Sequence, residues 1–461
     1  MRAWAVRTET PRPSDGGPDP EPAAEAAHSG DWLTQGRRAL ETLSFRTAAL
    51  PLSFVVTVIT SRYLLPDGRG AFALGVLTVT LGSTLLSIGT AVTREVGRKD
   101  EPIEAIVRRA LLLSLVLGVI GVAVLLPVGH VAEKGHRSAE LLVLGLPLLL
   151  VRQSIGGALI AVGRLRLFNV LLFLDPATLL GGLLLLVVAL DLGLPGAVAA
   201  WLAGTALTST VALIWTRDLW LSRVRRTARS ARTRAILSLG LKAGIVNLVA
   251  LINYRVEFFM LELYHGIHSV GVYSVSISLG ELLWLLSASV TTVVVAPAIH
   301  LDEDEAVAVV AQTVRHALLL TAAFGLALGA VSIVAVPIVY GDAYSGAVLP
   351  LLILIPGIIA YSPASVLSAY FSMRRGQMRF PMIVAGTSAI VNALFCLVLV
   401  SPYGAGGAAT ASTAGYVVGS LLLMMLFFRT GGTSPGQVVP RLSDMLAYRD
   451  LAVSLRSRAV R

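Results

Sequence analysis

Charged side chains are scarce in this sequence. Only 14% of its 461 residues are Asp, Glu, Lys or Arg, whereas 55% are apolar and the mean hydropathy is +0.78. A soluble domain carries about a quarter charged residues, so this composition excludes a cytosolic enzyme. Roughly 254 apolar residues, at about 20 for each spanning helix, are enough for about a dozen crossings of a bilayer. The composition therefore predicts an all-α polytopic membrane protein.

Cysteine is nearly absent as well. The one cysteine, Cys396, lies in an apolar stretch, which excludes a disulfide framework and a cluster of thiolate metal ligands. The histidines of the expected outer loops lack the spacing of metal ligands; they are His130, His136, His265 and His268. No Gly-x-x-x-x-Gly-Lys-Ser/Thr loop occurs, so ATP is not expected to drive the protein directly. We expect neither a metal nor a cofactor.

Apolar runs with the length of membrane-spanning helices recur along the chain. In the first half they lie near residues 46–64, 72–93, 110–128, 140–162, 169–190 and 195–216. In the second half they lie near residues 237–262, 270–297, 317–340, 346–371, 381–400 and 404–428. These runs predict about 12 transmembrane helices.

Basic residues mark one side of this arrangement. The loops predicted to be inside hold most of the Lys and Arg, including the Arg-rich segment 217–236, and the outer loops hold few. This asymmetry predicts a plasma (inner) membrane protein with both termini in the cytoplasm. Residues 1–42, rich in Pro, Gly and acidic residues, are expected to form a disordered cytoplasmic tail, and residues 429–461 a basic cytoplasmic tail. The net charge of +10 then mainly sets topology, and nucleic acid is not an expected partner.

An internal repeat divides the chain into two halves. Three segments of the first half parallel three of the second: Gly70–Ala73 and Gly271–Ser274, Gly163–Arg166 and Gly376–Arg379, Gly196–Gly204 and Gly407–Gly415. Residues 43–216 and 237–428 are therefore expected to form two six-helix bundles, joined by the basic cytoplasmic linker 217–236. Because six is even, both halves enter the membrane from the same side, which predicts a parallel pseudo-two-fold repeat. Small residues at these spacings also let membrane helices pack closely, whatever the function.

Two charges lie within predicted spans of the first half. With a rise of about 1.5 Å per residue, Arg152 lies about 16 Å from the inner end of its span and Asp175 about 10 Å from the same side. A charge at mid-bilayer costs about 2.5–3.5 kcal/mol, so each needs a partner, water or a function. A structural Arg152–Asp175 pair is one interpretation. The other is that Arg152, with Gln153 beside it, lines a cavity.

The spans near 237–262 and 270–297 hold further charges. Arg255 lies about 14 Å and Glu281 about 15 Å from the outer ends of successive antiparallel spans, which predicts that they pair. Glu257 faces another side of the helix, and Asn253, four residues earlier, is the neighbour we expect there. Lys242 lies near the inner end of its span and is expected to extend to the interface.

Several short motifs follow one another along the chain in a characteristic order and spacing. The first, Ser61-Arg-Tyr-Leu-Leu-Pro-Asp-Gly-Arg-Gly70-Ala-Phe, resembles the pattern Ala-Arg-x-Leu-Gly-Pro-x-x-x-Gly-x-Tyr/Phe of the polysaccharide-export flippases of the MATE-like MOP superfamily. Asn253-Tyr-Arg-Val-Glu257, Gly271-Val-Tyr-Ser274 and Glu281 are similar to the Asn-x-x-x-Asp, Val-Gly-x-Tyr-Ser, Glu series. Val339-Tyr-Gly-Asp-Ala-Tyr-Ser-Gly-Ala-Val348 and Leu352-Ile-Leu-Ile-Pro-Gly357 resemble a later family segment.

The resemblance covers residues 43 to 428 and has two departures. Glu257 stands where the family has Asp, and Leu65 stands where it has Gly. Peptidoglycan-precursor flippases of the same superfamily are less similar, since they typically have fourteen spans.

This resemblance implies a transporter, not an enzyme. It would flip undecaprenyl-pyrophosphate-linked oligosaccharide from the inner to the outer leaflet for cell-surface polysaccharide synthesis, by alternating access of two bundles. The expected partners are this lipid-linked glycan, membrane lipids, and the glycan polymerase and glycosyltransferases of the same pathway. Arg152, Gln153, Asn253 and Arg255 would bind the substrate, since guanidinium groups recognise pyrophosphate in a bidentate manner. Glu257, Glu281 and Asp175 would couple transport to protons or sodium, or form charge pairs only.

Two other functions compete with this one. A cation-coupled multidrug exporter of the same superfamily would share the fold, but the first span has no acidic residue and two buried arginines repel cationic drugs. A membrane-embedded polymerase or glycosyltransferase would need a sizeable outer loop with catalytic residues, and the outer loops here span about ten residues or fewer.

Overall fold

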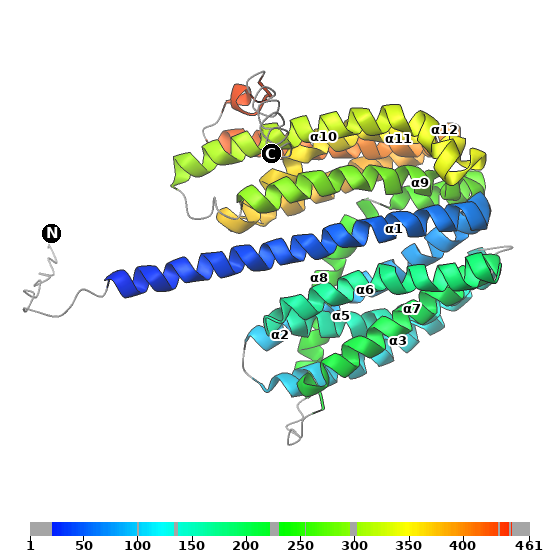
Figure 1. Ribbon diagram of the computed structural model, residues 1–461, viewed down its shortest axis with the longest axis horizontal. Coiled ribbons are helices and arrows are strands. Elements are labelled where there is room, and N and C mark those ends of the chain that lie inside the picture. The colour runs from blue at the N-terminus through cyan, green and yellow to red at the C-terminus, as the bar shows by residue number, and fades with distance from the viewer. Residues whose placement is uncertain are drawn as a thin grey trace, which may run out of the picture.

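The fold is all-helical. The computed structural model describes residues 21–98, 101–132, 137–221, 230–253, 255–295, 302–431, 434–441 and 444, and no β-strand occurs among them (Figure 1). The α-helices are α1 (Glu21–Leu86), α2 (Ile88–Gly97), α3 (Ile103–Ala132), α4 (Arg137–Glu140), α5 (Leu146–Ala161), α6 (Leu165–Leu183), α7 (Gly193–Trp215), α8 (Ser230–Asn253), α9 (Val256–Val295), α10 (Glu303–Tyr340), α11 (Val348–Ala369) and α12 (Arg379–Gly431). Shorter helical turns are η1 (Leu141–Gly145), η2 (Leu184–Ala189), η3 (Arg217–Leu219), η5 (Asp342–Ala347), η6 (Tyr370–Arg374) and η7 (Pro435–Gln437). The all-α prediction is confirmed.

Three long helices contain a break at which the chain turns. The backbone leaves the helical conformation at Leu65 in α1, at Gly266 in α9 and at Gly404 in α12. In the described part of the chain, 8 helical stretches are long and apolar enough to cross a membrane. The predicted ranges lie on these helices and on α8 and α9, although the full count of twelve crossings stays a prediction.

The helices form two groups on either side of α1. Figure 1 shows α2, α3, α5, α6 and α7 on one side and α9 to α12 on the other. The first group shares an apolar core made by residues between Ile59 and Ile236. The second group has two apolar cores, and Leu74 and Leu77 of α1 contribute to one of them. The second half of α1 therefore packs against both groups.

The internal repeat reappears in the backbone. Leu65 (φ 58, ψ 174) and Gly266 (φ 76, ψ 174) break the helix in the same conformation at equivalent positions of the two halves. Gly163 and Gly376, which the repeat also pairs, both have positive φ, at 75° and 61°. Since a positive φ is rare outside glycine, these matched breaks support the two-bundle repeat independently of side-chain similarity.

The N-terminal segment departs from its prediction. Residues 21–42 belong to α1, so the disordered tail predicted for residues 1–42 is wrong for this part, and residues 1–20 lie outside the described ranges. The physical reason is local composition: residues 21–42 are rich in Ala, Glu, Leu and Arg, which have high helix propensity.

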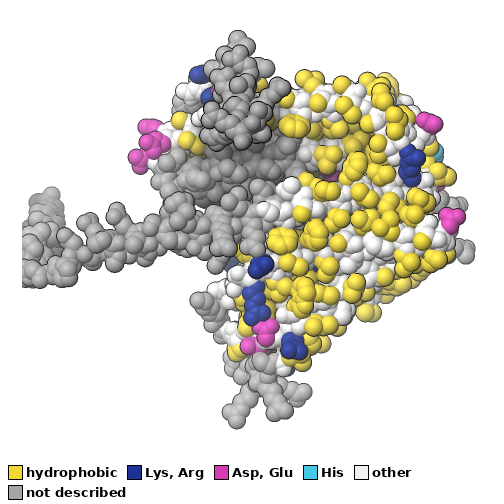
Figure 2. Space-filling view, in the orientation of Figure 1, with side chains coloured by type: hydrophobic (Ala, Val, Ile, Leu, Met, Phe, Trp, Pro, Cys, Tyr) yellow, Lys and Arg dark blue, Asp and Glu magenta, His cyan; other side chains and the backbone are white. Residues whose placement is uncertain are grey.

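The described surface has the character of a membrane protein. Figure 2 shows apolar side chains over most of the visible described face, with charged side chains gathered toward its two ends. Large apolar residues such as Val119, Leu326 and Val398 are more than 60% exposed. A hydrocarbon environment accounts for such a surface, whereas water would not.

Candidate functional site

A cavity of about 740 Å³ lies between the first helix group and α8. Its polar lining comes from α1, the α1–α2 break, α2, α5 and α8, and consists of Thr84, Ser87, Thr90, Thr93, Arg94, Arg152, Gln153 and Asn247. Its apolar lining comes from α5 and α6 and consists of Ile160, Phe168, Leu171 and Leu172. The cavity therefore has one polar, basic wall and one apolar wall.

A break in the second span builds the polar wall. Ser87, between α1 and α2, has φ 36° and ψ 41°, a left-handed conformation that interrupts the helix. Its hydroxyl donates to the Thr84 carbonyl at 2.6 Å and accepts from Asn247 Nδ2 at 3.1 Å. Gln153 Nε2 donates to the Ser83 carbonyl at 3.4 Å, just before the break. The break thus joins α1, α5 and α8 around the cavity.

Close packing of glycines holds α2 against α5 on this wall. A Cβ atom on Gly157 would lie 2.1 Å from the Gly89 carbonyl oxygen, so only glycine permits this approach. Thr93 Oγ1 donates to the carbonyls of both Gly89 and Gly157, each at 3.0 Å. This contact sets α2, which carries Arg94, beside α5, which carries Arg152.

Arg152 and Asp175 form an ion pair between α5 and α6. Their side chains keep 27% and 29% of their surface exposed, so the pair is accessible from a cavity. Arg152 also lines a second cavity of about 280 Å³, together with Asp175, Thr80, Trp201 and Thr205. Arg152 is therefore paired with Asp175 and also lines the 740 Å³ cavity.

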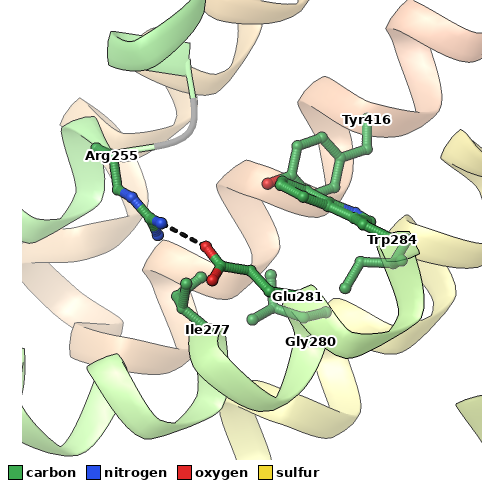
Figure 3. A pocket seen from close by; sticks show the side chains of 8 residues that line it. Arg255, Ile277, Gly280, Glu281, Trp284 and Tyr416 are labelled. Atoms are coloured by element: carbon green, nitrogen blue, oxygen red, sulfur yellow. Dashed lines mark hydrogen bonds and ion pairs between the residues drawn. The ribbon is translucent and has the colours of Figure 1, made fainter. Parts of the chain in front are cut away.

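Arg255 and Glu281 form the second predicted pair, within the second helix group. Figure 3 shows their side chains pointing toward each other, with Trp284 and Tyr416 nearby. Arg255 lines a void of about 10 Å³ here, and the lining of the 740 Å³ cavity does not include it. The structure therefore does not bring Arg255 and Arg152 to one cavity.

Glu257 is fully buried between α9 and α12. Its Oε1 accepts from the Ser412 hydroxyl and from Asn392 Nδ2, the latter at 3.3 Å. Cys396 Sγ donates in turn to Asn392 Oδ1 at 3.4 Å, while Oε2 of Glu257 has no hydrogen-bond partner within the described part of the chain. Asn253, the neighbour expected from the sequence, has a side chain outside the described residues.

Sequence reasoning missed several residues of the cavity wall, chiefly Arg94, Ser87 and Asn247. Arg94 lies at the end of α2, where its charge fits an inner loop that sets topology. Ser87 and Asn247 carry no motif. A signal was nevertheless present in the polar run of Thr84, Ser87, Thr90 and Thr93 at helical spacing within an otherwise apolar span.

At the end predicted to face outward, α1 is joined to the second helix group. Arg62 Nε donates to the Val339 carbonyl at 2.8 Å, and a second Arg62 nitrogen donates to the Ile338 carbonyl. Tyr344 Oη donates to the Ser61 carbonyl at 3.1 Å. The cavity, in contrast, extends to Arg94 and Phe168, which adjoin the predicted inner loops.

Known proteins of the same fold are membrane transporters. An inward-facing multidrug resistance MATE family transporter of the MOP superfamily matches with a TM-score of 0.65 at 18% identity, covering 86% of this chain and 98% of that chain. The lipid II flippase MurJ, in its inward closed conformation, matches with a TM-score of 0.70 at 15% identity, covering 83% and 87%. A MOP superfamily transporter from Pyrococcus furiosus gives 0.57 at 16% identity, covering 86% and 94%. No curated protein sequence shows a significant match.

These similarities show that the chain has the fold of the MOP superfamily transporters. Residues 38–300 match the family described as polysaccharide biosynthesis protein, which is more than half of the chain. The chain belongs to that family.

Proposed function

We propose that this protein is a flippase that moves undecaprenyl-pyrophosphate-linked oligosaccharide from the inner to the outer leaflet for cell-surface polysaccharide synthesis. The observation that carries the proposal is Arg152 in the 740 Å³ cavity. A guanidinium group held at membrane depth binds pyrophosphate in a bidentate manner and stays charged when partly buried. The family match and the fold of a lipid II flippase support the same class of substrate.

The two walls of the cavity suit an amphiphilic substrate. Arg94, Arg152, Gln153 and the hydroxyl groups of α1 and α2 would bind the pyrophosphate and the sugars. The wall around Phe168 and Leu172 would face the isoprenoid chain. Asn253, at the end of α8, and Arg255, just before α9, would meet the substrate after the two groups move.

Transport would proceed by alternating access. The contacts of Arg62 and Tyr344 close the end predicted to be outside, while the cavity reaches the inner ends of α2 and α6. The structure would then represent the state that receives substrate from the cytoplasmic leaflet. Rocking of the two groups would break the outer contacts and release the substrate outward.

Glu257 is the proposed coupling residue. Its Oε1 is bound by Ser412 and Asn392, and among the described residues its Oε2 has no hydrogen-bond partner, so this oxygen can accept a proton or a sodium ion. Glu281, which is paired with Arg255, and Asp175, which is paired with Arg152, are proposed as charge partners instead.

Reconstituted protein tests the flippase proposal directly. In proteoliposomes, a fluorescent isoprenyl-pyrophosphate disaccharide reports flipping through its accessibility to an external quencher. We expect Arg152→Ala to lower the initial rate at least tenfold, about the effect of losing one hydrogen-bonded charge contact, and Arg152→Lys to restore part of it. The control is Arg164→Ala, which removes an exposed arginine outside the cavity. Undiminished flipping by both Arg152 variants at normal expression removes Arg152 from the mechanism.

A multidrug exporter is the second candidate, and the MATE fold favours it. Arg94 and Arg152 in the cavity oppose it, since they repel cationic drugs. Drug resistance on overexpression, without a glycan defect on deletion, decides for the exporter. Plasma-membrane location with cytoplasmic termini is part of the flippase proposal and can be checked by labelling cysteines placed at either end.

A further inference from the structure

Arg152 lies between two cavities. It lines the 740 Å³ cavity beside Gln153, and it lines the 280 Å³ cavity beside Asp175. Asp175 is the one carboxylate that lines either of these cavities in the described part of the chain. One guanidinium group therefore faces its internal partner on one side and the proposed substrate space on the other.

The second half of the chain has an arginine–carboxylate pair of its own, at a different position in the repeat. Val76 and Thr80 line the smaller cavity of the first half, and Ile277 and Glu281, each 201 residues later, line the void of the second half. Arg255 pairs with Glu281 there, but the void is only about 10 Å³. Each group of helices thus contains an arginine–carboxylate pair, although Glu281 corresponds to Thr80 and not to Asp175, and in the first group the arginine also lines the large cavity.

We propose that Asp175 is an internal counter-ion that competes with the pyrophosphate of the substrate for Arg152. This inference rests on the proposed function and adds to it a residue that sets substrate affinity and promotes release. With no substrate, Asp175 holds the guanidinium group. When the substrate enters, the pyrophosphate takes over its N–H donors, and when Asp175 pairs again the substrate is released.

The exchange is physically balanced in this setting. An unpaired arginine within the membrane is unfavourable, so Asp175 stabilises the empty transporter. Both acceptors use the same charge-assisted hydrogen bonds, so the substrate gains only the difference between them. The 280 Å³ beside Asp175 has room for water to hydrate the carboxylate after Arg152 leaves it.

Removing the competitor should therefore tighten binding. The probe is farnesyl pyrophosphate, measured by calorimetry on purified protein in nanodiscs, and inorganic pyrophosphate tests the headgroup alone. We expect Asp175→Asn to lower the Kd for farnesyl pyrophosphate by about tenfold to a hundredfold, which is the effect of one charged hydrogen-bond partner. We expect Arg152→Ala to abolish binding. The matched control is Asp218→Asn, which frees Arg164 outside the cavity and should leave Kd unchanged.

Transport kinetics give a second readout. If Asp175 promotes release, Asp175→Asn should lower the KM for the fluorescent substrate and also lower kcat, whereas a merely structural role would lower kcat without tightening binding. If the wild type binds and Arg152→Ala does not, an unchanged Kd in Asp175→Asn overturns the competition between Asp175 and the substrate. That result would still be consistent with an anion-binding site at Arg152. Absence of pyrophosphate binding in the wild type overturns the proposed function as well.

The unaltered protein provides a test that does not depend on a variant folding. Dicyclohexylcarbodiimide modifies protonated carboxyl groups in the membrane, and a carboxyl group without an arginine partner is protonated more readily. Mass spectrometry locates the product. Labelling of Asp175 should rise when farnesyl pyrophosphate is added and should not rise with farnesol, which lacks the charge. Equal labelling with and without farnesyl pyrophosphate refutes the exchange.

Discussion

Leu65 occupies a backbone conformation that glycine prefers. Its φ of 58° and ψ of 174° match those of Gly266, its equivalent in the repeat, and its side chain is 60% exposed. The family resemblance also assigns glycine to this position. We predict that the protein is more stable with glycine than with alanine at either position. The experiment compares Leu65→Gly with Leu65→Ala, and it compares the wild type with Gly266→Ala.

The magnitude follows from two opposing effects. A residue with a Cβ atom in this region is strained by about 1–3 kcal/mol. Alanine gains about 0.4–1 kcal/mol over glycine because it restricts the unfolded chain. Glycine should therefore win by about 1–2 kcal/mol at each position. Apart from its own chain neighbours, no atom of the described residues lies within 4 Å of the Cβ that alanine would place at Gly266, so a clash with another helix does not contribute there.

Equilibrium unfolding in mixed micelles, followed by circular dichroism, measures these differences. Comparing glycine with alanine at position 65 cancels the loss of the leucine side chain, so the backbone effect is isolated. At an ordinary exposed turn alanine would be the more stable residue, so the sign of the difference is decisive. A Leu65→Ala protein as stable as Leu65→Gly would refute the strain argument.

Two further predictions concern packing and pH. Gly157→Ala should lower the free energy of unfolding by about 1–3 kcal/mol, because its Cβ would meet the Gly89 carbonyl. Gly181→Ala, which has open space around it, should not lower this free energy and serves as the control. The same unfolding assay measures both variants, and equal effects would contradict the packing argument. At the face predicted to be cytoplasmic, the Arg164 guanidinium lowers the pKa of Asp218, to which it donates at 3.1 and 2.5 Å. Because the folded pKa is lowered, the pair stabilises the protein above about pH 4, the ordinary range of the carboxyl, and this contribution fades as pH falls through the lowered value. Because the pair is exposed, it should contribute less than about 1 kcal/mol to the free energy of unfolding. The difference in melting temperature between the wild type and Asp218→Asn should therefore be small at pH 7 and should vanish in acid. A difference that persists in acid would contradict this assignment.

Residues on neighbouring spans were the most predictable part of the site. The Arg255–Glu281 pair follows from counting residues back from a shared turn, since helical rise converts sequence number directly into depth. The Arg152–Asp175 pair follows in the same way from two spans joined by a short inner loop. The twelve ranges and the repeat depend only on apolar length and small-residue spacing, which are local properties.

Contacts between distant helices were not predictable in this way. Glu257 meets Asn392 and Ser412, which are 135 and 155 residues away, and only the packing of α9 against α12 brings them together. At position 65 the sequence shows only that leucine replaces the glycine of the family pattern. The significance of Leu65 lies in its positive φ, which the sequence does not reveal. Arg94 was assigned to topology because a charge at a helix end serves that purpose whether or not a cavity lies beside it.

The contacts at the end predicted to face outward respond differently to substitution of their donors and of their acceptors. Arg62 and Tyr344 donate to carbonyl oxygens of the main chain at Ile338, Val339 and Ser61. A carbonyl is present whatever side chain a codon specifies, so substitutions at those three acceptors leave the bonds available. Replacement of either donor removes them outright. Among natural sequences, substitutions should consequently be frequent at the three positions that supply the acceptor carbonyls and rare at positions 62 and 344.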